Sequence, residues 1–356
     1  MSPAEAKPHI VSAEIAEQPD VVARLLDRQR HAIEALAAEV RGRRPPYAVL
    51  AARGSSDNAA RYAQHLLGRL LRLPVALATP SLHTLYDAPP RYADGLVLGI
   101  SQSGASPDVV SVVAEGARQG ALTAAITNDP LSPLASAAAH VIDLGAGEER
   151  SVAATKTYTA SLAAIAALAA DGDRVRTAEV RRLPAALAAQ LVRSGDVGAA
   201  VDAGSEWTRL TVVGRGAHYA TAFEAALKVR ELAGIVAEAY SPADLRHGPI
   251  ATVGPSQPLM AIAPDGPTLA SMRELVASAR ERGARVTAIG HDPALGAPGR
   301  EALAPGDPFL ALVDVPEWLG PVVAIVPAQL LAVGLAERRG VEVDTPFGLS
   351  KITLTR

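Results

Sequence analysis

Short runs of apolar residues alternate along the chain with longer stretches that carry apolar residues at helical spacing. In the first half the apolar runs lie at 47–52, 75–78, 96–100, 122–127 and 140–143. These runs are continuous rather than alternating, a pattern typical of strands that are covered on both faces. The longer stretches predict helices at 57–71, 106–119 and 155–170. Strands that alternate with helices in this way predict a parallel α/β sheet.

The second half of the chain repeats this arrangement. Its predicted strands lie at 210–214, 235–239, 259–263, 286–289 and 309–313. Its predicted helices lie at 219–232, 267–282 and 321–338. In both halves the first strand runs into an Arg-Gly pair and then a helix, at Arg53-Gly54 and at Arg215-Gly216. We therefore expect a duplicated domain, each copy a doubly wound parallel sheet flanked by helices.

Helical segments outside the two copies complete the predicted organisation. A helical arm at 14–36 precedes the first copy, and an Ala- and Arg-rich helical stretch near 175–193 joins the two copies. The predicted divisions are an arm at 1–40, a first domain at 41–180, a linker at 181–204, a second domain at 205–340 and a C-terminal tail at 341–356. A chain of 356 residues is long enough for two such cores.

Charge and composition exclude several classes of function. The 34 basic and 37 acidic residues give a net charge of -3 without a basic run, which argues against a nucleic-acid partner. The chain contains no cysteine, which excludes disulfides and thiol nucleophiles. The polar start of the chain, residues 1–10, has no apolar signal core, and Pro327 and Gln329 interrupt the apolar stretch 322–336. We therefore predict a cytoplasmic protein with no membrane partner.

Two polar segments follow predicted strands at the edge where doubly wound sheets bind ligands. Gly54, Ser55 and Ser56 follow the first strand, and the segment 101–106, with three serines, follows the third. Hydroxyl groups beside a helix N-terminus suit a phosphate. Serine is also a favoured helix cap, so capping is an equal alternative for either segment taken alone.

The motifs predict no nucleotide and no metal. A P-loop would need a glycine before Lys156-Thr157, and Thr155 stands there. Gly214-Arg215-Gly216 opens a helix after a strand, but Tyr219 replaces the third glycine of the dinucleotide fingerprint. The eight histidines show no metal-binding spacing. We therefore predict a protein without cofactor or metal.

Lysine is rare in this chain. Among 34 basic residues only four are lysines, namely Lys7, Lys156, Lys228 and Lys351. The lysine amine can form an imine, whereas the arginine guanidinium cannot. Lys228 shares one predicted helix face with Glu224 and Glu231, four residues before it and three after it. Such spacing fits either an exposed salt-bridge ladder or a base with its counter-ion.

Seven segments in one order along the chain resemble the SIS (sugar isomerase) family, and within it the isomerase half of glutamine–fructose-6-phosphate aminotransferase and the related deaminases. The segments are 14–19, 53–56, 100–104, 151–156, 224–231, 238–249 and 346–353. Each is short, but together they extend over essentially the whole chain. The resemblance implies two SIS domains and a sugar-phosphate substrate.

The resemblance also implies roles for individual residues. Those expected to hold the substrate and its phosphate are Gly54, Ser55, Ser56, Ser101, Gln102, Ser103, Ser106, Val152, Ala154 and Ser350. Lys351 would form the imine with the open-chain ketose, and Glu231, beside Lys228, would move a proton between C1 and C2. His247 would help to open the sugar ring from the second subunit, which implies a homodimer.

The chain departs from the aminotransferase around the substrate and in its nitrogen source. Without cysteine it lacks the glutaminase nucleophile, so we expect conversion of glucosamine 6-phosphate to fructose 6-phosphate and ammonia. Ala105-Ser106-Pro107, Ala154 and Phe347-Gly348 differ from the family pattern, which puts the substrate in question. Dehydration of N-acetylglucosamine 6-phosphate, a fructosamine-6-phosphate deglycase activity and a sensor that binds a sugar phosphate without reacting are the alternatives.

Overall fold

Ten strands in the described residues form two parallel sheets, which confirms the predicted fold class. The computed structural model describes residues 9–194, 197–291, 306–345, 348 and 351. The first sheet contains β1 (Ala48–Ala51), β2 (Val75–Leu77), β3 (Leu96–Ser101), β4 (Leu122–Thr127) and β5 (His140–Asp143). The second contains β6 (Arg209–Gly214), β7 (Val236–Tyr240), β8 (Leu259–Ile262), β9 (Val286–His291) and β10 (Phe309–Leu312). The strand orders are β2-β1-β3-β4-β5 and β10-β9-β8-β6-β7.

Helices connect the strands and precede the first of them. In the first half they are α1 (Ile10–Ala16), α2 (Gln18–Arg28), α3 (Arg30–Arg43), α4 (Gly54–Leu70), α5 (Ser81–Thr84), α6 (Pro107–Arg118), α7 (Pro133–Ala137) and α8 (Lys156–Ala170). They continue with α9 (Arg174–Val180), α10 (Leu183–Arg193), α11 (Gly198–Gly204), α12 (His218–Ala233), α13 (Pro242–Arg246), α14 (Leu269–Glu281) and α15 (Gly320–Arg338).

Two helical segments differ from the prediction. The arm is divided into α1, α2 and α3 instead of one helix. Pro19 in the first turn of α2 explains the first division, because a proline ring clashes with the carbonyl four residues before it and cannot continue α1. Helix α4 begins at Gly54, three residues before the predicted start, so Ser55 and Ser56 lie in its first turn rather than in a loop.

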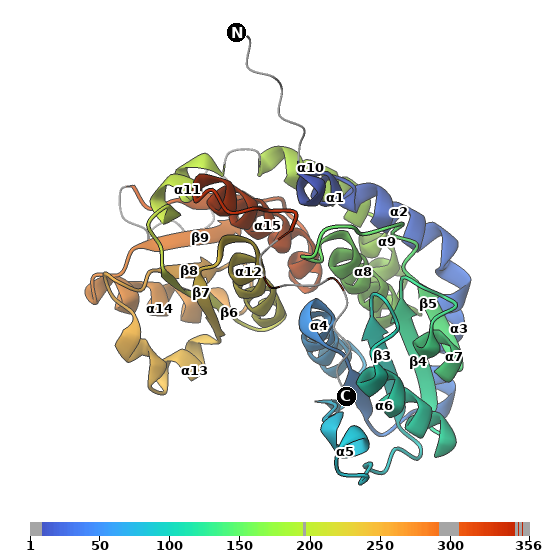
Figure 1. Ribbon diagram of the computed structural model, residues 1–356. Coiled ribbons are helices and arrows are strands. Elements are labelled where there is room, and N and C mark those ends of the chain that lie inside the picture. Colours follow the sequence, from blue (N-terminus) through green and yellow to red (C-terminus); the bar gives the residue numbers. More distant parts are fainter. Residues whose placement is uncertain (1–8, 195–196, 292–305, 346–347, 349–350, 352–356) are drawn as a thin grey trace.

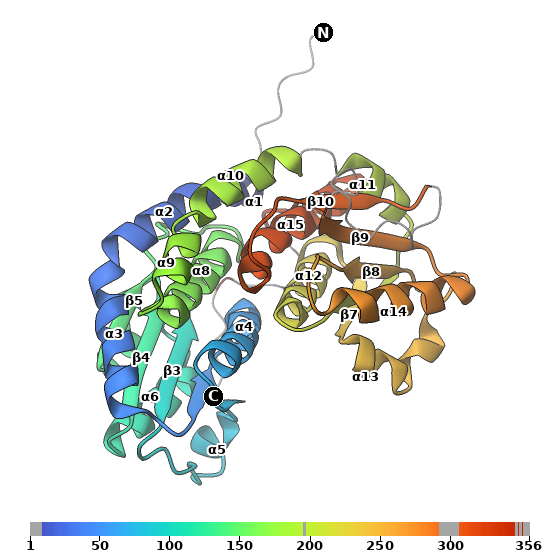
Figure 2. The same cartoon turned by 180° about the vertical axis from the view of Figure 1, so that it is seen from behind.

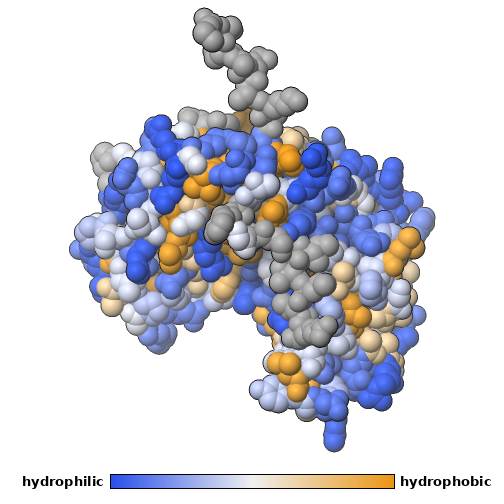
Figure 3. Space-filling view, viewed as in Figure 1, coloured by the Kyte–Doolittle hydropathy of each residue, from blue (hydrophilic) through white to orange (hydrophobic). Residues whose placement is uncertain are grey.

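One hydrophobic core runs through both halves of the molecule. Each sheet turns one face towards it, and α4, α8, α12 and α15 lie between the sheets (Figures 1 and 2). The opposite face of the first sheet packs against α6, and that of the second against α14. Helices thus cover both faces of each sheet, which accounts for the continuous apolar runs. The visible surface is mostly hydrophilic, with a notch between the lower ends of the halves (Figure 3).

The most apolar helix of the described residues is part of this core. The segment Glu317–Arg338 is long and apolar enough to cross a membrane, but 89% of its most apolar window is buried inside the fold. Packing of α15 against α12, α10 and α1 accounts for that composition, since a helix that is apolar all round can be a core helix.

Strand order brings the two serine-containing segments together. β1 and β3 are neighbours, and the chain leaves them towards opposite sides of the first sheet, through β2 and β4. The N-terminus of α4 and the segment 101–106 therefore meet at the carboxyl edge, where open α/β sheets bind ligands. In the second sheet the corresponding segment after β8, 263–268, has no serine and a single hydroxyl side chain, that of Thr268. Only the first sheet presents serines at this position.

Candidate active site

The segment after β3 is a tight turn that requires glycine. Gly104 has a φ of +59°, and a Cβ at this position would lie 2.1 Å from the Ser132 Oγ. The Ser101 Oγ accepts a hydrogen bond of 3.1 Å from the Gly104 N–H, and the Ser103 Oγ accepts one of 3.3 Å from the Ala105 N–H. The turn thereby reverses the direction of the chain between the end of β3 and the start of α6.

Side chains around this turn leave polar groups for a ligand. Ser106 is the N-cap residue of α6, yet its side chain makes no capping hydrogen bond. Gln102, Ser103, Ser106, Ser55 and Ser56 are all partly exposed, whereas Ser101 is buried. These positions favour the ligand-binding interpretation over capping. The two segments are also tied together, because the Arg53 Nε donates a 2.7 Å hydrogen bond to Asp108 in the first turn of α6.

Lys228 lies at the centre of a buried network and not in an exposed ladder. Its side chain and that of Glu224 are both 0% exposed, whereas that of Glu231 is 24% exposed. The Lys228 Nζ lies 2.5 Å from Glu231 Oε2, 3.4 Å from Glu224 Oε1 and 3.2 Å from the Ser55 Oγ. Glu224 also accepts hydrogen bonds from Ser55, at 2.8 Å, and Asn58, at 2.7 Å. The buried Lys228 thus fixes the position of the partly exposed Glu231 carboxylate.

The charge of Lys228 follows from its neighbours. Burial would lower the pKa of Lys228, but Glu224 and Glu231 outweigh burial and raise the pKa above its ordinary value. Lys228 is therefore a cation at neutral pH.

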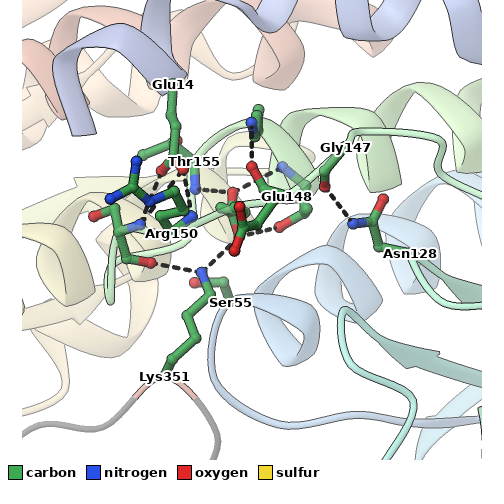
Figure 4. Close-up of polar contacts among 12 residues, drawn as sticks. Glu14, Ser55, Asn128, Gly147, Glu148, Arg150, Thr155 and Lys351 are labelled. Atoms are coloured by element: carbon green, nitrogen blue, oxygen red, sulfur yellow. Dashed lines mark hydrogen bonds and ion pairs between the residues drawn. The ribbon is translucent and has the colours of Figure 1, made fainter. Parts of the chain in front are cut away.

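Lys351 of the tail is seated on a buried carboxylate (Figure 4). Its Nζ lies 2.9 Å from Glu149 Oε2 and donates a 2.6 Å hydrogen bond to the Ser151 carbonyl. Glu149 also accepts hydrogen bonds from the Thr155 N–H, at 2.9 Å, and from the Thr157 Oγ1, at 2.7 Å. Lys351 is therefore held by two contacts and is not a solvent-exposed surface charge.

Several contacts hold Glu149 in its ionised form. Burial by itself would raise the pKa of Glu149, but the charge of Lys351 and the hydrogen bonds from Thr155 and Thr157 outweigh it. The pKa consequently lies below its ordinary value of 4.5.

The Lys228 and Lys351 networks belong to one site. Helix α4 packs against both α8 and α12, and Ser55 at its start contacts Lys228. The charge of Glu149 contributes to raising the pKa of Lys228, which places the two networks within electrostatic range. Segments far apart in the sequence, around Glu149, Lys228 and Lys351, thus lie near the start of α4.

The remaining predicted residues have different positions. Gly54 is exposed, and Val152 and Ala154 are partly exposed in the segment before α8. His247, after α13, is exposed, and no hydrogen bond or ion pair of the described residues joins its side chain to Glu231 or Lys351. Ser350 lies outside the described residues. Within the described part of the chain, no group of three or more His, Asp or Glu residues could hold a metal.

Sequence reasoning missed Glu149 and Glu14. Glu149 is the carboxylate under Lys351, and the buried Glu14 of α1 accepts hydrogen bonds from the backbone N–H groups of Arg150 and Ser151. A signal was present for the first residue, because an acidic pair, Glu148-Glu149, lies one residue before the matched segment 151–156. Its role depends on a contact with a residue 202 positions away.

Known proteins share this sequence pattern and fold. The family model of the SIS domain matches residues 45–170 and 205–294. Glutamine–fructose-6-phosphate aminotransferase (isomerizing) from Zymomonas mobilis is 32% identical over 365 residues, which cover 96% of this chain and 58% of that protein. A candidate phosphosugar isomerase from Silicibacter pomeroyi DSS-3 is 35% identical, with a TM-score of 0.83 and coverage of 95% and 99%. The C-terminal domain of the Francisella tularensis glucosamine-fructose-6-phosphate aminotransferase has a TM-score of 0.83 at 25% identity, with coverage of 97% and 100%.

Proposed function

Because the chain belongs to the SIS family of phosphosugar isomerases, we propose that it is an amino-sugar-phosphate isomerase/deaminase. Its reaction would convert glucosamine 6-phosphate to fructose 6-phosphate and ammonia. The observation that carries the proposal is a pair of charged networks within electrostatic range of each other, Lys351 on Glu149 and Lys228 on Glu231 and Ser55. An amine, a carboxylate and a hydroxyl-rich anion site are the groups that imine exchange on a sugar phosphate needs.

Phosphate binding would fix the substrate at the carboxyl edge of the first sheet. Ser55, Ser56, Ser103 and Ser106 are partly exposed there, beside the N-termini of α4 and α6. Hydroxyl donors and helix N-termini favour a dianion. Binding energy from the phosphate would hold the reacting carbons in place.

Glu231 would transfer the proton and Lys351 would exchange the nitrogen. In the open-chain amino sugar, Glu231 removes the C2 proton and returns it at C1, which leaves an imine at C2. The Lys351 amine then attacks C2, ammonia leaves, and water hydrolyses the new imine to fructose 6-phosphate and the free lysine. Lys351 must leave Glu149 and lose its proton before it can attack.

The partner in this proposal is a second copy of the chain. His247 is exposed and lies on the second half, so a neighbouring subunit could receive it. It would then assist ring opening across a homodimer interface. We propose a cytoplasmic location, consistent with a metabolic sugar phosphate as substrate.

Incubation with glucosamine 6-phosphate tests the proposal. We expect ammonia and fructose 6-phosphate in equal amounts, with a loss of about 10²–10⁴-fold in kcat for Glu231→Gln. Glu274→Gln, a change of the same kind at an exposed ion pair with Arg246, is the matched control and should keep full activity. Absence of turnover at high enzyme concentration would refute the proposal, and loss of water from N-acetylglucosamine 6-phosphate would favour dehydration instead. A sensor would bind the sugar phosphate equally well with Lys351→Ala and never turn it over.

A further inference from the structure

We propose that helix α1 positions Lys351 through contacts at two places. One is the root of the tail, defined as Val343 and Asp344, and the other is the segment 148–151, which binds the lysine amine. We call this device the α1 clamp, and define it as Ile10, Val11, Glu14 and Glu17. The proposal rests on the proposed function, because it assigns the clamp to the same site. It treats these as positioning residues that act through Lys351.

The N-terminal end of α1 holds the root of the tail. The Asp344 carboxylate accepts hydrogen bonds of 3.1 Å from the Ile10 N–H and 3.2 Å from the Val11 N–H. Val343, beside it, is 1% exposed and packs in the main core. Lys351 follows Asp344 by seven residues. The root of the tail is therefore fixed to the arm of the protein.

The C-terminal end of α1 holds the segment that receives Lys351. Glu14 is 3% exposed, and its carboxylate accepts a 3.2 Å hydrogen bond from the Ser151 N–H. The carbonyl of the same Ser151 accepts the hydrogen bond from the Lys351 Nζ. Ser151 thus links Glu14 to the Lys351 amine, and Glu14 and Lys351 approach this segment from opposite sides (Figure 4).

Lys156 secures the same segment from a second direction. Its Nζ donates 2.7 Å hydrogen bonds to the Glu148 carbonyl and to the Glu17 carboxylate, and its side chain is 3% exposed. Glu148 directly precedes Glu149, the counter-ion of Lys351. This contact explains why a lysine with no part in the imine chemistry stands in the matched segment 151–156.

The rarity of lysine makes the clamp measurable. Acylation with acetic anhydride, read by mass spectrometry, reports on Lys351 without any substrate, and the fully buried Lys228 is the internal reference. For Asp344→Ala we expect Lys351 acylation to rise and kcat to fall, each by about tenfold or more, with KM nearly unchanged, because misplacement by ~1 Å has effects of this order. Glu14→Ala should act in the same way, and Glu14→Gln should retain most of the protection, because its amide oxygen can still accept the backbone hydrogen bonds.

Asp202→Ala is the matched control, since it removes a carboxylate that pairs with Arg338 on the surface. This variant should leave acylation and turnover unchanged. Unchanged Lys351 acylation in folded Asp344→Ala and Glu14→Ala proteins would overturn the clamp, and circular dichroism confirms folding. If acylation follows the expected pattern but the wild-type protein does not turn over glucosamine 6-phosphate, the result supports the clamp and refutes the proposed substrate.

Discussion

Each of the three lysines in the described part of the chain binds a carboxylate. Lys156 pairs with Glu17, Lys228 with Glu224 and Glu231, and Lys351 with Glu149. Two of these lysines are almost completely buried. A lysine ammonium is a compact charge, whereas a guanidinium is a wider planar group that would need more room. Where arginine has taken most basic positions, the three described lysines remain where a small cation contacts a carboxylate.

At the residue scale, Glu149→Gln tests how much the ion pair between Glu149 and Lys351 contributes to stability. The folded pKa of Glu149 lies below its unfolded value near 4.5, so its ionised form stabilises the fold above that pH. We expect the substitution to lower the free energy of unfolding at pH 7 by about 1–3 kcal/mol, since it weakens hydrogen bonds to a charged group. The deficit should shrink as the pH falls below about 4.5 and through the lowered folded pKa.

Denaturant unfolding of both proteins at several pH values measures this deficit. Glu274→Gln, at an exposed ion pair, should show little deficit at any pH. A deficit for Glu149→Gln that grows towards acid pH would contradict the assigned direction of the pKa.

At the scale of elements, the turn before α6 is the part of the proposed phosphate site whose backbone shape is most constrained. Its backbone turns at Gly104, where a positive φ and the nearby Ser132 exclude any side chain. The turn and the first residues of α4 follow neighbouring strands, so both lie at the same edge of the sheet. If phosphate binds at this edge, as proposed, its binding should depend on the shape of the turn as well as on the serines.

Gly104→Ala and Gly120→Ala form a matched pair for this turn. Both glycines have positive φ, +59° and +81°, but only at Gly104 would a Cβ meet other atoms. Each alanine should cost about 1–3 kcal/mol of stability through backbone strain. Only Gly104→Ala should also weaken binding of inorganic phosphate, measured by calorimetry. Equal phosphate affinities in the two variants would show that the turn is not the anion site.

At the scale of the whole molecule, the site lies where the two halves meet. Ser55 and Asn58 of α4 bind Glu224 of α12, and the main hydrophobic core continues from one sheet to the other. The two sheets should therefore unfold together, because neither can bury its inner face alone.

Lys228→Met tests how much this junction depends on its buried charges. The change leaves Glu224 buried without its cation, and we expect a loss of about 3–5 kcal/mol in the free energy of unfolding. Lys228→Met combined with Glu224→Gln should recover most of that loss, because no buried charge then lacks its partner. Urea unfolding measures Lys228→Met, Glu224→Gln and the double variant, and a loss in the double variant equal to the sum of the two single losses would refute the coupling.

Subunit mixing tests the proposed contribution of His247. His247→Ala and Glu231→Gln should each be nearly inactive. An equal mixture should regain about a quarter of the wild-type activity, since about half of its dimers are heterodimers and one of the two sites in each heterodimer is intact. Activity is measured after unfolding and refolding the two proteins together. No recovery in a verified mixture would place His247 in the site of its own chain or outside the site.

Local sequence determined the elements and the chemical groups. Every one of the ten strands lies within about a residue or two of its predicted position, because periodicity is a local property. The serines, Glu231 and Lys351 were named from short segments that resemble the SIS family, and their roles remain predictions. Tertiary structure alone decided which groups meet. Lys228 reaches Ser55 across 173 positions, Lys351 reaches Glu149 across 202, and Asp344 reaches Ile10 across 334. Such contacts follow from how helices pack between the two sheets, which no local pattern encodes, and for that reason Glu149 and the α1 clamp emerged only from the fold.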